Sequence, residues 1–334
     1  MVGIIILNWN GWKDTIECLQ SLKQCSGQFY ITLVDNGSTD DSVNIISNYL
    51  KQTNWKYNIF KESQGLYYEP DNKECIIYQL NENYGFAKGN NKALKFISPF
   101  MPKWCLLLNN DTETTPDFLS NLLNFANENP KYEILTPLIN YYFNKNLVWN
   151  AGGNLNWGFR KYNYSDCLSN RIRESKYIEC SFVTGCALLF KTKLLDKEFK
   201  LFTEDFFHGE EDVDLSLRMK ANGLHMACVL NSVIYHKVNR STQTMNNTGK
   251  MFVYFLNRFI NIKKHFGPLN YKIWKIIHIV LVFLYLLIKQ KMSFKRTYIF
   301  CSLLSRESSD KESVTKDDFF KYIKRFDCRE KCEK

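Results

Sequence analysis

Three aspartates, Asp35, Asp111 and Asp212, stand where a carboxylate could do chemistry. The first two follow apolar runs that have the length of buried strands, and Asp212 begins an amphipathic stretch. A carboxylate so placed can bind a hard divalent cation such as Mg²⁺ or Mn²⁺, or take a proton from a substrate hydroxyl. Metal-assisted or base-assisted group transfer is the chemistry that these residues could support.

Polar residues follow three predicted strands at the point where each strand ends. They are Asn8-Trp9-Asn10, Asp35-Asn36 and Asn110-Asp111. Ligands of open α/β sheets bind beyond the carboxyl ends of the strands, so these residues should meet in one crevice. No G-x-G-x-x-G follows the first strand, and no G-x-x-x-x-G-K-[ST] occurs, so the phosphate cradles of dinucleotide and P-loop proteins are missing. A nucleotide bound in this crevice would need a divalent metal to neutralise its phosphates.

The elements that position these residues can be predicted from hydrophobic periodicity. Apolar runs alternate with amphipathic stretches over the first 110 residues, which predicts β-α units around a mainly parallel sheet. Residues 52–75 look like an insertion without chemistry of their own. The predicted strands cover residues 3–7, 30–34, 76–80 and 104–108, and the first helix carries Trp12, Ile16, Leu19 and Leu22 at helical spacing.

A further helix should follow Asp111. Thr115 and Pro116 predict its start, because threonine is a favoured N-cap and proline suits the first helical position. Its expected buried stripe is Phe118, Leu119, Leu122, Phe125 and Ala126. Beyond residue 130 the alternation fades, and we expect residues 113–245 to build the acceptor side of the site.

Four motifs occur in a fixed order along the chain. They are Asp35–Asp40 (DNGSTD), Glu82–Asn91 (ENYGFAKGNN), Leu108–Thr112 (LNNDT), and Glu211–Arg218 (EDVDLSLR) followed by Tyr235-His236. Together they resemble the inverting family 2 glycosyltransferases of the GT-A fold, most closely the rhamnosyltransferase-like branch of bacterial surface polysaccharide synthesis. The resemblance covers about residues 3 to 242, and it implies a Rossmann-like α/β mixed sheet.

The resemblance also implies roles at the nucleotide. Asp35 would hydrogen-bond the nucleobase, and Asn8 and Trp9 would wall the same pocket. Asn110 would face the ribose. The segment from Asn83 to Asn90 looks like the loop that closes over the donor.

The remaining implied roles concern the metal and the reaction. Asp111 would bind a divalent metal, Mn²⁺ or Mg²⁺, that bridges the diphosphate, and His236 matches a histidine that completes this site in some members. Asp212 falls on the catalytic base. The family's usual D-x-D motif is replaced by Asn109-Asn110-Asp111, and one fewer carboxylate should weaken metal binding. The residues expected on the acceptor side or in support are Gly185, Glu211 and Asp214.

Ordinary structural roles compete with several of these roles. Glu211 and Asp212 could be first-turn acids favoured by the helix dipole, and Asp214 could pair with Arg218 at i, i+4. His236 could be a hydrogen-bonded structural histidine, and Gly185 could serve backbone geometry. Asp35 could only shape a turn, although a turn needs no carboxylate there.

The formal charge of +10 lies in one segment. Residues 250–300 contain ten lysines and arginines and no acid, while the rest of the chain is balanced. The apolar run Ile276–Ile288 is shorter than the roughly 20 residues that span a bilayer, so we expect a helix buried on the catalytic domain or lying in the membrane interface. The unopposed basic residues favour peripheral attachment to an anionic cytoplasmic membrane over nucleic-acid binding, for which no recognised module is present.

The eleven cysteines show no regular spacing, so neither a disulfide framework nor a zinc ribbon is indicated, and a cytoplasmic location is expected. We therefore expect a catalytic domain over residues 1–245, with residues 1–112 as its nucleotide-binding half, and a helical extension over residues 246–334. The predicted activity moves a sugar, from dTDP-rhamnose or a UDP-sugar, to a glycan or polyprenyl-linked glycan of the cell surface. The alternatives are a non-catalytic nucleotide-sugar-binding scaffold and a sugar nucleotidyltransferase, whose glycine- and lysine-rich signature is missing near Asn8.

Overall fold

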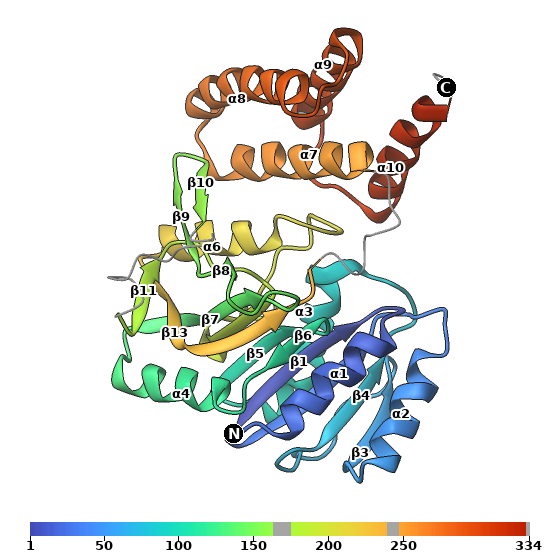
Figure 1. Cartoon of the computed structure of the whole chain (residues 1–334), viewed down its shortest axis with the longest axis vertical. Coiled ribbons are helices and arrows are strands. Elements are labelled where there is room, and N and C mark those ends of the chain that lie inside the picture. Colours follow the sequence, from blue (N-terminus) through green and yellow to red (C-terminus); the bar gives the residue numbers. More distant parts are fainter. Residues whose placement is uncertain (163–174, 239–246, 332–334) are drawn as a thin grey trace. The chain divides into compact units, whose positions relative to one another are not determined.

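A computed structural model describes residues 1–162, 175–238 and 247–331 of the chain (Figure 1). The chain divides into two compact units, which we call the sheet unit and the helical unit. The sheet unit comprises Met1–Thr203 with Glu211–Gln243, and the helical unit comprises Glu204–Glu210 with Thr244–Lys334. The domain boundary predicted at residue 245 lies outside the described residues and stays a prediction.

One mixed sheet organises the sheet unit. In the described residues it has 11 strands, with the path β11-β13-β7-β12-β5-β1-β2-β4-β3, while β6 pairs with β13 and β8 with β7. The strands from β5 to β3 run parallel, and β12 is antiparallel to both of its neighbours. The strands are β1 Val2–Asn8, β2 Phe29–Asp35, β3 Tyr57–Lys61, β4 Cys75–Gln79, β5 Trp104–Asn109, β6 Thr112–Thr114, β7 Tyr132–Tyr141, β8 Val148–Asn150, β11 Tyr177–Cys180, β12 Ala187–Lys191 and β13 His225–His236; β9 Gly153–Asn156 and β10 Phe159–Tyr162 form a separate pair.

Helices cover both faces of this sheet. Successive residues of a strand point to opposite faces, so each buried strand contributes side chains to a core on each face. Ile4 and Ile6 of β1 belong to a core with Leu19 and Leu122, whereas Ile5 belongs to a second core with Leu94. The helices of the sheet unit are α1 Trp12–Lys23, α2 Ser42–Gln52, α3 Gly85–Ile97, α4 Phe118–Glu128 and α6 Glu211–Ala221. The structure confirms the predicted α/β mixed sheet.

Two local predictions in the sheet unit are wrong. Residues 52–75 contain β3, an edge strand parallel to β4, so this stretch is not only an insertion. Helix α4 begins at Phe118 rather than at Pro116, because residues 115–117 form a turn in which the Phe118 amide donates to the Thr115 carbonyl oxygen, 3.2 Å away. The predicted buried stripe of α4 is confirmed in full.

The helical unit contains α7 Asn247–His265, α8 Pro268–Ile288, α9 Phe294–Asp310 and α10 Lys316–Lys331. Its core is aromatic, and the Phe252 ring of α7 lies 5.1 Å from that of Phe300 and 4.9 Å from that of Tyr322. The structure confirms the helical C-terminal extension.

Helix α8 corrects the length expected for the apolar run. It has 21 residues, because it begins at Pro268, eight residues before Ile276, and continues through Lys272 and Lys275. Within the described residues it is the one helix long and apolar enough, by length and composition, to cross a membrane.

Candidate active site

Strand register brings the predicted polar residues to one edge of the sheet. Asn8 of β1 lies opposite Asp35 of β2, and Leu7 lies opposite Asn109 of β5. Asn110 and Asp111 therefore follow β5 at the edge where Asn8 and Asp35 end their strands. The crevice residues expected from the sequence are brought together here.

Asp35 is held by Asn8 from the neighbouring strand. The fully buried Asn8 amide donates to Asp35 Oδ1 over 3.0 Å and to Ser38 Oγ over 3.2 Å. Ser38 donates its hydroxyl to Asp35 Oδ1 over 2.6 Å and its backbone N–H to Oδ2 over 3.2 Å. The Asn8 side chain thus orients Asp35 from within the protein. Trp9, the next residue after Asn8, is partly exposed.

A buried hydroxyl that the sequence reasoning missed links Asn8 to Asn110. Thr15 of α1 donates to Asn8 Oδ1 over 2.9 Å, and Asn110 Nδ2 donates to Thr15 Oγ1 over 3.0 Å. Thr15 is fully buried. Apolar periodicity cannot find it, since a threonine inside a helix looks like a solvent-facing residue.

The segment expected as a donor-closing loop is only partly a loop. From Gly85 onward it is the beginning of α3, and the buried Asn90 donates to the Phe86 carbonyl oxygen over 2.9 Å. Asn83 lies before this helix, where its Oδ1 accepts from the Gly85 amide over 2.9 Å and from Asn36 over 3.1 Å. The expectation of a loop is therefore corrected for residues 85–90, which a backbone hydrogen-bonded helix holds.

Gly37 permits the turn after β2 to approach the segment before α3. Its φ is +67°, and a Cβ at this position would lie 2.4 Å from the Glu82 carbonyl carbon. Any other residue would clash with backbone as well as adopt a left-handed conformation. The turn chemistry predicted from DNGSTD thus has a specific packing cause.

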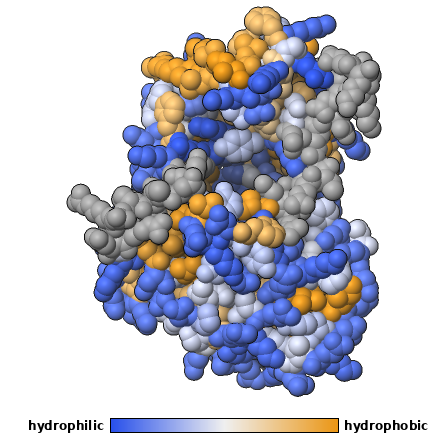
Figure 2. Space-filling model, viewed as in Figure 1, coloured by the Kyte–Doolittle hydropathy of each residue, from blue (hydrophilic) through white to orange (hydrophobic). Residues whose placement is uncertain are grey.

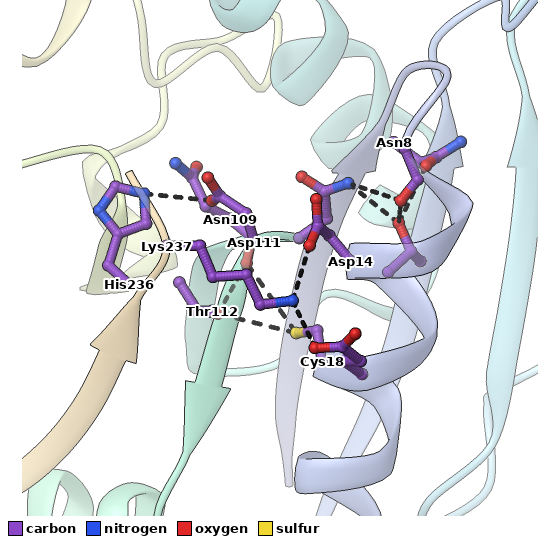
Figure 3. Close-up of polar contacts among 12 residues, drawn as sticks. Asn8, Asp14, Cys18, Asn109, Asp111, Thr112, His236 and Lys237 are labelled. Atoms are coloured by element: carbon purple, nitrogen blue, oxygen red, sulfur yellow. Dashed lines mark hydrogen bonds and ion pairs between the residues drawn. The ribbon is translucent and has the colours of Figure 1, made fainter. Parts of the chain in front are cut away.

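Asp111, the residue after Asn110, forms a nearly buried pair with His236. Asp111 Oδ1 lies 3.1 Å from His236 Nε2, and the Lys237 amide donates to the Asp111 carbonyl oxygen over 3.0 Å (Figure 3). Pairing of β13 with β6 sets this arrangement, since His236 lies opposite Thr112. Burial opposes a positive charge on His236, but Cys186 and the Asp111 carboxylate outweigh it and raise the pKa of the imidazole to about 10.

Lys237 is a second residue that sequence reasoning missed. Its buried ammonium lies 2.6 Å from Asp14 and 2.5 Å from Glu17, both on α1 (Figure 3). Burial lowers the pKa of Lys237, but the hydrogen bonds that its ammonium donates to the two carboxylates outweigh burial and raise it. The lysine ties the end of β13 to α1 immediately after His236, and no local sequence signal reveals partners more than 200 residues away.

Asp212 lies in the first turn of α6, where its Oδ2 accepts the Gly185 amide over 3.3 Å. Gly185 itself packs on Phe86, whose ring would lie 3.1 Å from a Cβ there. Burial raises the pKa of the neighbouring Cys186 thiol, His236 lowers it, and the Asp111 and Asp212 carboxylates raise it further. The Cys186 carbonyl oxygen accepts the Asn109 amide over 2.8 Å, so Gly185 and its partner Asp212 lie near the end of β5, just before Asp111.

The other acids of the α6 motif are buried. Asp214 accepts from Arg218 Nε over 2.8 Å, which confirms the predicted i, i+4 ion pair. Arg218 also donates to the Leu201 carbonyl oxygen over 2.8 Å. Asp214 thus anchors α6, and Glu211 lies buried in the first turn.

The donor set around Asp111 fits a divalent cation that arrives with its substrate. Among the described residues no group of three His, Cys, Asp or Glu side chains could hold a metal alone. Asp111 and His236 supply one carboxylate oxygen and one imidazole nitrogen side by side, and His236 would bind a cation after giving up its proton. Nucleotide-bound Mg²⁺ is commonly held by one or two carboxylates together with substrate phosphates and water, so two protein ligands are enough for such a site.

Comparison with known proteins relates this geometry to a family. A sequence model described as Glycosyl transferase family 2 matches residues 3–199, more than half of the chain. A search of curated proteins found no match.

Solved structures show the same fold at low sequence identity. GalNAc-T7 with UDP, GalNAc and Mn²⁺ has a TM-score of 0.58 and 14% identity, over 97% of this chain and 56% of that chain. The mannosyltransferase PcManGT from Pyrobaculum calidifontis, in complex with GDP-Man and Mn²⁺, has a TM-score of 0.51 and 13% identity. The match covers 94% of this chain and 76% of that chain. Residues 1–349 of S. aureus TarS, in complex with UDP-GlcNAc, have a TM-score of 0.50 and 15% identity, over 78% and 66%. The chain spans less than two thirds of the GalNAc-T7 and TarS chains, and the likeness concerns the GT-A fold.

Proposed function

Because the chain belongs to glycosyltransferase family 2, we propose that it transfers one sugar, with inversion, from a nucleoside diphosphate sugar to an acceptor hydroxyl. The observation that carries this proposal is that Asp111, its partner His236 and Asp212 lie near the end of β5, at the sheet edge where Asp35 ends β2. This gives one group for each task that such a transfer sets. The tasks are holding the nucleotide, neutralising the diphosphate and removing a proton.

The nucleotide end of the proposed site is built on Asp35. Its carboxylate is fixed by Asn8 and Ser38, so it can accept a hydrogen bond from a nucleobase without first ordering itself. Trp9, which follows Asn8 in the chain and is partly exposed, is the proposed wall of the same pocket. Asn110 stands next along the edge, where we place the ribose, and Asn83 and Asn90 support the segment that faces the donor.

Asp212 is the proposed base. Its carboxylate takes the proton of the acceptor hydroxyl while that oxygen bonds to the anomeric carbon, and the bond from this carbon to the diphosphate oxygen breaks. The nucleoside diphosphate leaves with the electron pair. The Gly185 amide holds one carboxylate oxygen, which directs Asp212 toward the site. Glu211 and Asp214 support the helix that carries Asp212.

Asp111 and His236 are the proposed ligands of a divalent cation, Mn²⁺ or Mg²⁺. Such a cation would neutralise the charge that develops on the leaving diphosphate. The two side chains lie side by side as a nearly buried pair, with 3.1 Å between Asp111 Oδ1 and His236 Nε2. The Mn²⁺ in the GalNAc-T7 and PcManGT structures supports this proposal.

The finer identity of the reaction rests on the resemblance of the motifs. We place the chain in the rhamnosyltransferase-like branch, with dTDP-rhamnose or a UDP-sugar as donor. A glycan or polyprenyl-linked glycan of a surface polysaccharide, such as O-antigen or capsule, is the proposed acceptor. The proposed location is the cytoplasmic face of the membrane, where such an acceptor would be built. The UDP-sugar and GDP-Man ligands of the similar structures support a nucleotide sugar as donor.

A donor panel tests the proposal. The purified chain is incubated with dTDP-, UDP- and GDP-sugars, with Mn²⁺ or with EDTA, and release of nucleoside diphosphate is measured. We expect slow hydrolysis of one nucleotide class that depends on Mn²⁺, and stabilisation of the chain by the matching diphosphate in thermal shift. Absence of both effects with every nucleotide would contradict the proposed activity.

A further inference from the structure

Helix α8 has two apolar faces. One face is buried in the helical unit by Trp274, His278, Val282 and Leu286, which recur every four residues. The His278 ring stacks on Trp274 with 3.8 Å between ring centroids, and Trp274 also packs edge-on against Phe259 of α7. These contacts bury the apolar side chains on one side of α8 only.

The opposite face of α8 exposes large apolar side chains. Ile276 is 61% exposed, Val280 53% and Leu284 45%, and their spacing of four places them in one row. Figure 2 shows hydrophobic residues gathered over α8 and α9. We call this surface the α8 stripe; it consists of Leu269, Ile273, Ile276, Ile277, Val280, Leu281, Leu284 and Ile288, continued by Phe294 and Tyr298 of α9. A contiguous apolar surface of this kind marks an interaction site rather than ordinary surface.

Basic residues border the α8 stripe. Lys289, Lys291 and Lys295 are exposed at the connection between α8 and α9, and Lys272 is exposed near the start of α8. No carboxylate among the described residues pairs with any of these four lysines. Since residues 250–300 contain no acid at all, the positive charge beside the stripe is not compensated locally.

We propose that the α8 stripe binds an anionic lipid bilayer and lies in the plane of its interface. Apolar residues would enter the acyl boundary while the bordering lysines meet acidic headgroups. A second copy of this chain fits less well, because it would bring the same uncompensated lysines together. Charge complementarity therefore selects a membrane as the occupant.

The buried contacts of α8 favour lying on the membrane over crossing it. Lys275 donates to the Ser305 carbonyl oxygen over 2.7 Å and to Ser309 Oγ over 2.6 Å, which ties α8 to α9. A spanning helix would have to break these bonds and expose the His278 ring to hydrocarbon. In the interfacial position every one of these contacts is kept.

This inference stands on a different part of the chain from the proposed transfer, so the two can fail separately. The test measures co-sedimentation of the full chain with vesicles of phosphatidylcholine, with and without phosphatidylserine. Ile276→Glu, Val280→Glu and Leu284→Glu combined should abolish binding, because three carboxylates would enter an apolar and anionic environment. The matched control carries Ile59→Glu and Tyr67→Glu, two exposed apolar positions of the sheet unit, and should bind as the natural chain does.

Three single substitutions test the contribution of the lysine charges. Lys289→Gln, Lys291→Gln and Lys295→Gln should each weaken binding to phosphatidylserine vesicles by roughly fivefold, with little effect on neutral vesicles. Donor hydrolysis in solution should be unchanged in all of these variants, which separates membrane binding from the proposed activity.

Three outcomes would overturn the inference. Unchanged vesicle binding by the triple glutamate variant would exclude the α8 stripe. Failure of the natural chain to bind vesicles, together with a dimer in light scattering that the same variant dissociates, would assign the stripe to a second copy. Retention on vesicles after alkaline carbonate washing would show a spanning helix instead of an interfacial one.

Discussion

The crevice of the sheet unit and helix α8 of the helical unit depart from the usual burial rule in opposite directions. In the crevice, Asn8, Asp111 and His236 are buried although they are polar, whereas α8 exposes Ile276 and Val280 although they are apolar. A buried polar group is costly unless it is hydrogen-bonded; Asn8 bonds Asp35, and His236 Nε2 pairs with Asp111, inside the protein. The exposed face of α8 finds nothing inside the helical unit to cover it. This contrast is the basis for proposing a small polar ligand at the first region and a bilayer at the second.

The strongest test of the crevice is Asp212→Asn. An amide keeps the shape but cannot take a proton, so transfer and donor hydrolysis should fall by roughly 10²- to 10⁴-fold. Asp214→Asn on the same helix is the matched control, because Asp214 bonds Arg218 and should affect thermal stability more than rate. Rates of the two variants are compared with each donor that the natural chain hydrolyses. Wild-type rates in Asp212→Asn would show that another group is the base.

Asp111→Ala should have the next largest effect. It leaves His236 as the single proposed metal ligand, so the Mn²⁺ dependence of nucleoside diphosphate binding should largely disappear, with affinity in Mn²⁺ lower by roughly tenfold to 100-fold. Isothermal calorimetry with Mn²⁺ or EDTA measures this, and Glu128→Gln, an exposed acid of α4, serves as control. Unchanged Mn²⁺ dependence would remove Asp111 from the metal site.

The sequence could predict the crevice because its information is local. A polar residue directly after an apolar run marks a strand end, and parallel strands align their ends, so Asn8, Asp35 and Asp111 could be placed together in advance. Thr15 and Lys237 could not be placed. Thr15 is a buried hydroxyl within an apolar helix face, and Lys237 pairs with two acids of α1 that lie more than 200 residues earlier in the sequence.

The same reasoning fell short for α8 and β3. The apolar run Ile276–Ile288 is shorter than α8, because the helix also includes Lys272 and Lys275, and lysine continues a helix well. Residues 52–75 seemed polar because β3 is an edge strand with exposed side chains, which blur its period-2 pattern. Hydrophobic periodicity indicates an element with one buried side. It therefore does not detect exposed edge strands or helices with two apolar faces.

Asn8→Ala asks whether the buried bonds of the crevice also stabilise the fold. The change removes bonds to Asp35, Ser38 and Thr15 inside the protein, so the free energy of unfolding should fall by roughly 1–3 kcal/mol. Urea unfolding followed by circular dichroism measures it. Asn124→Ala on the exposed face of α4 is the control and should change stability little. Equal stability of both variants would mean that the Asn8 network serves ligand binding alone.

Lys237→Met should have a smaller effect on stability, about 1–2 kcal/mol. Methionine fills the space of the lysine stem but leaves Asp14 and Glu17 near each other without the ammonium between them. Both carboxylates reach solvent in part, which limits the loss. Lys51→Met, at an exposed position of α2, is the matched control in the same unfolding experiment. A more stable Lys237→Met would show that burial of the charge outweighs its two ion pairs.

The smallest change in the free energy of unfolding is expected on the exposed face of α8. It allows the exposed and buried faces of one helix to be compared. Ile276→Ser should alter the free energy of unfolding in solution by less than about 0.5 kcal/mol, because the side chain is largely exposed before and after the change. Val282→Ser, one and a half turns further on the buried face, should cost more, since it places a hydroxyl in the aromatic core and removes packed methyl groups. Unfolding of both variants is measured without lipid. Similar losses would mean that the α8 stripe is covered inside the folded chain, and the apolar surface would then serve the fold rather than a membrane.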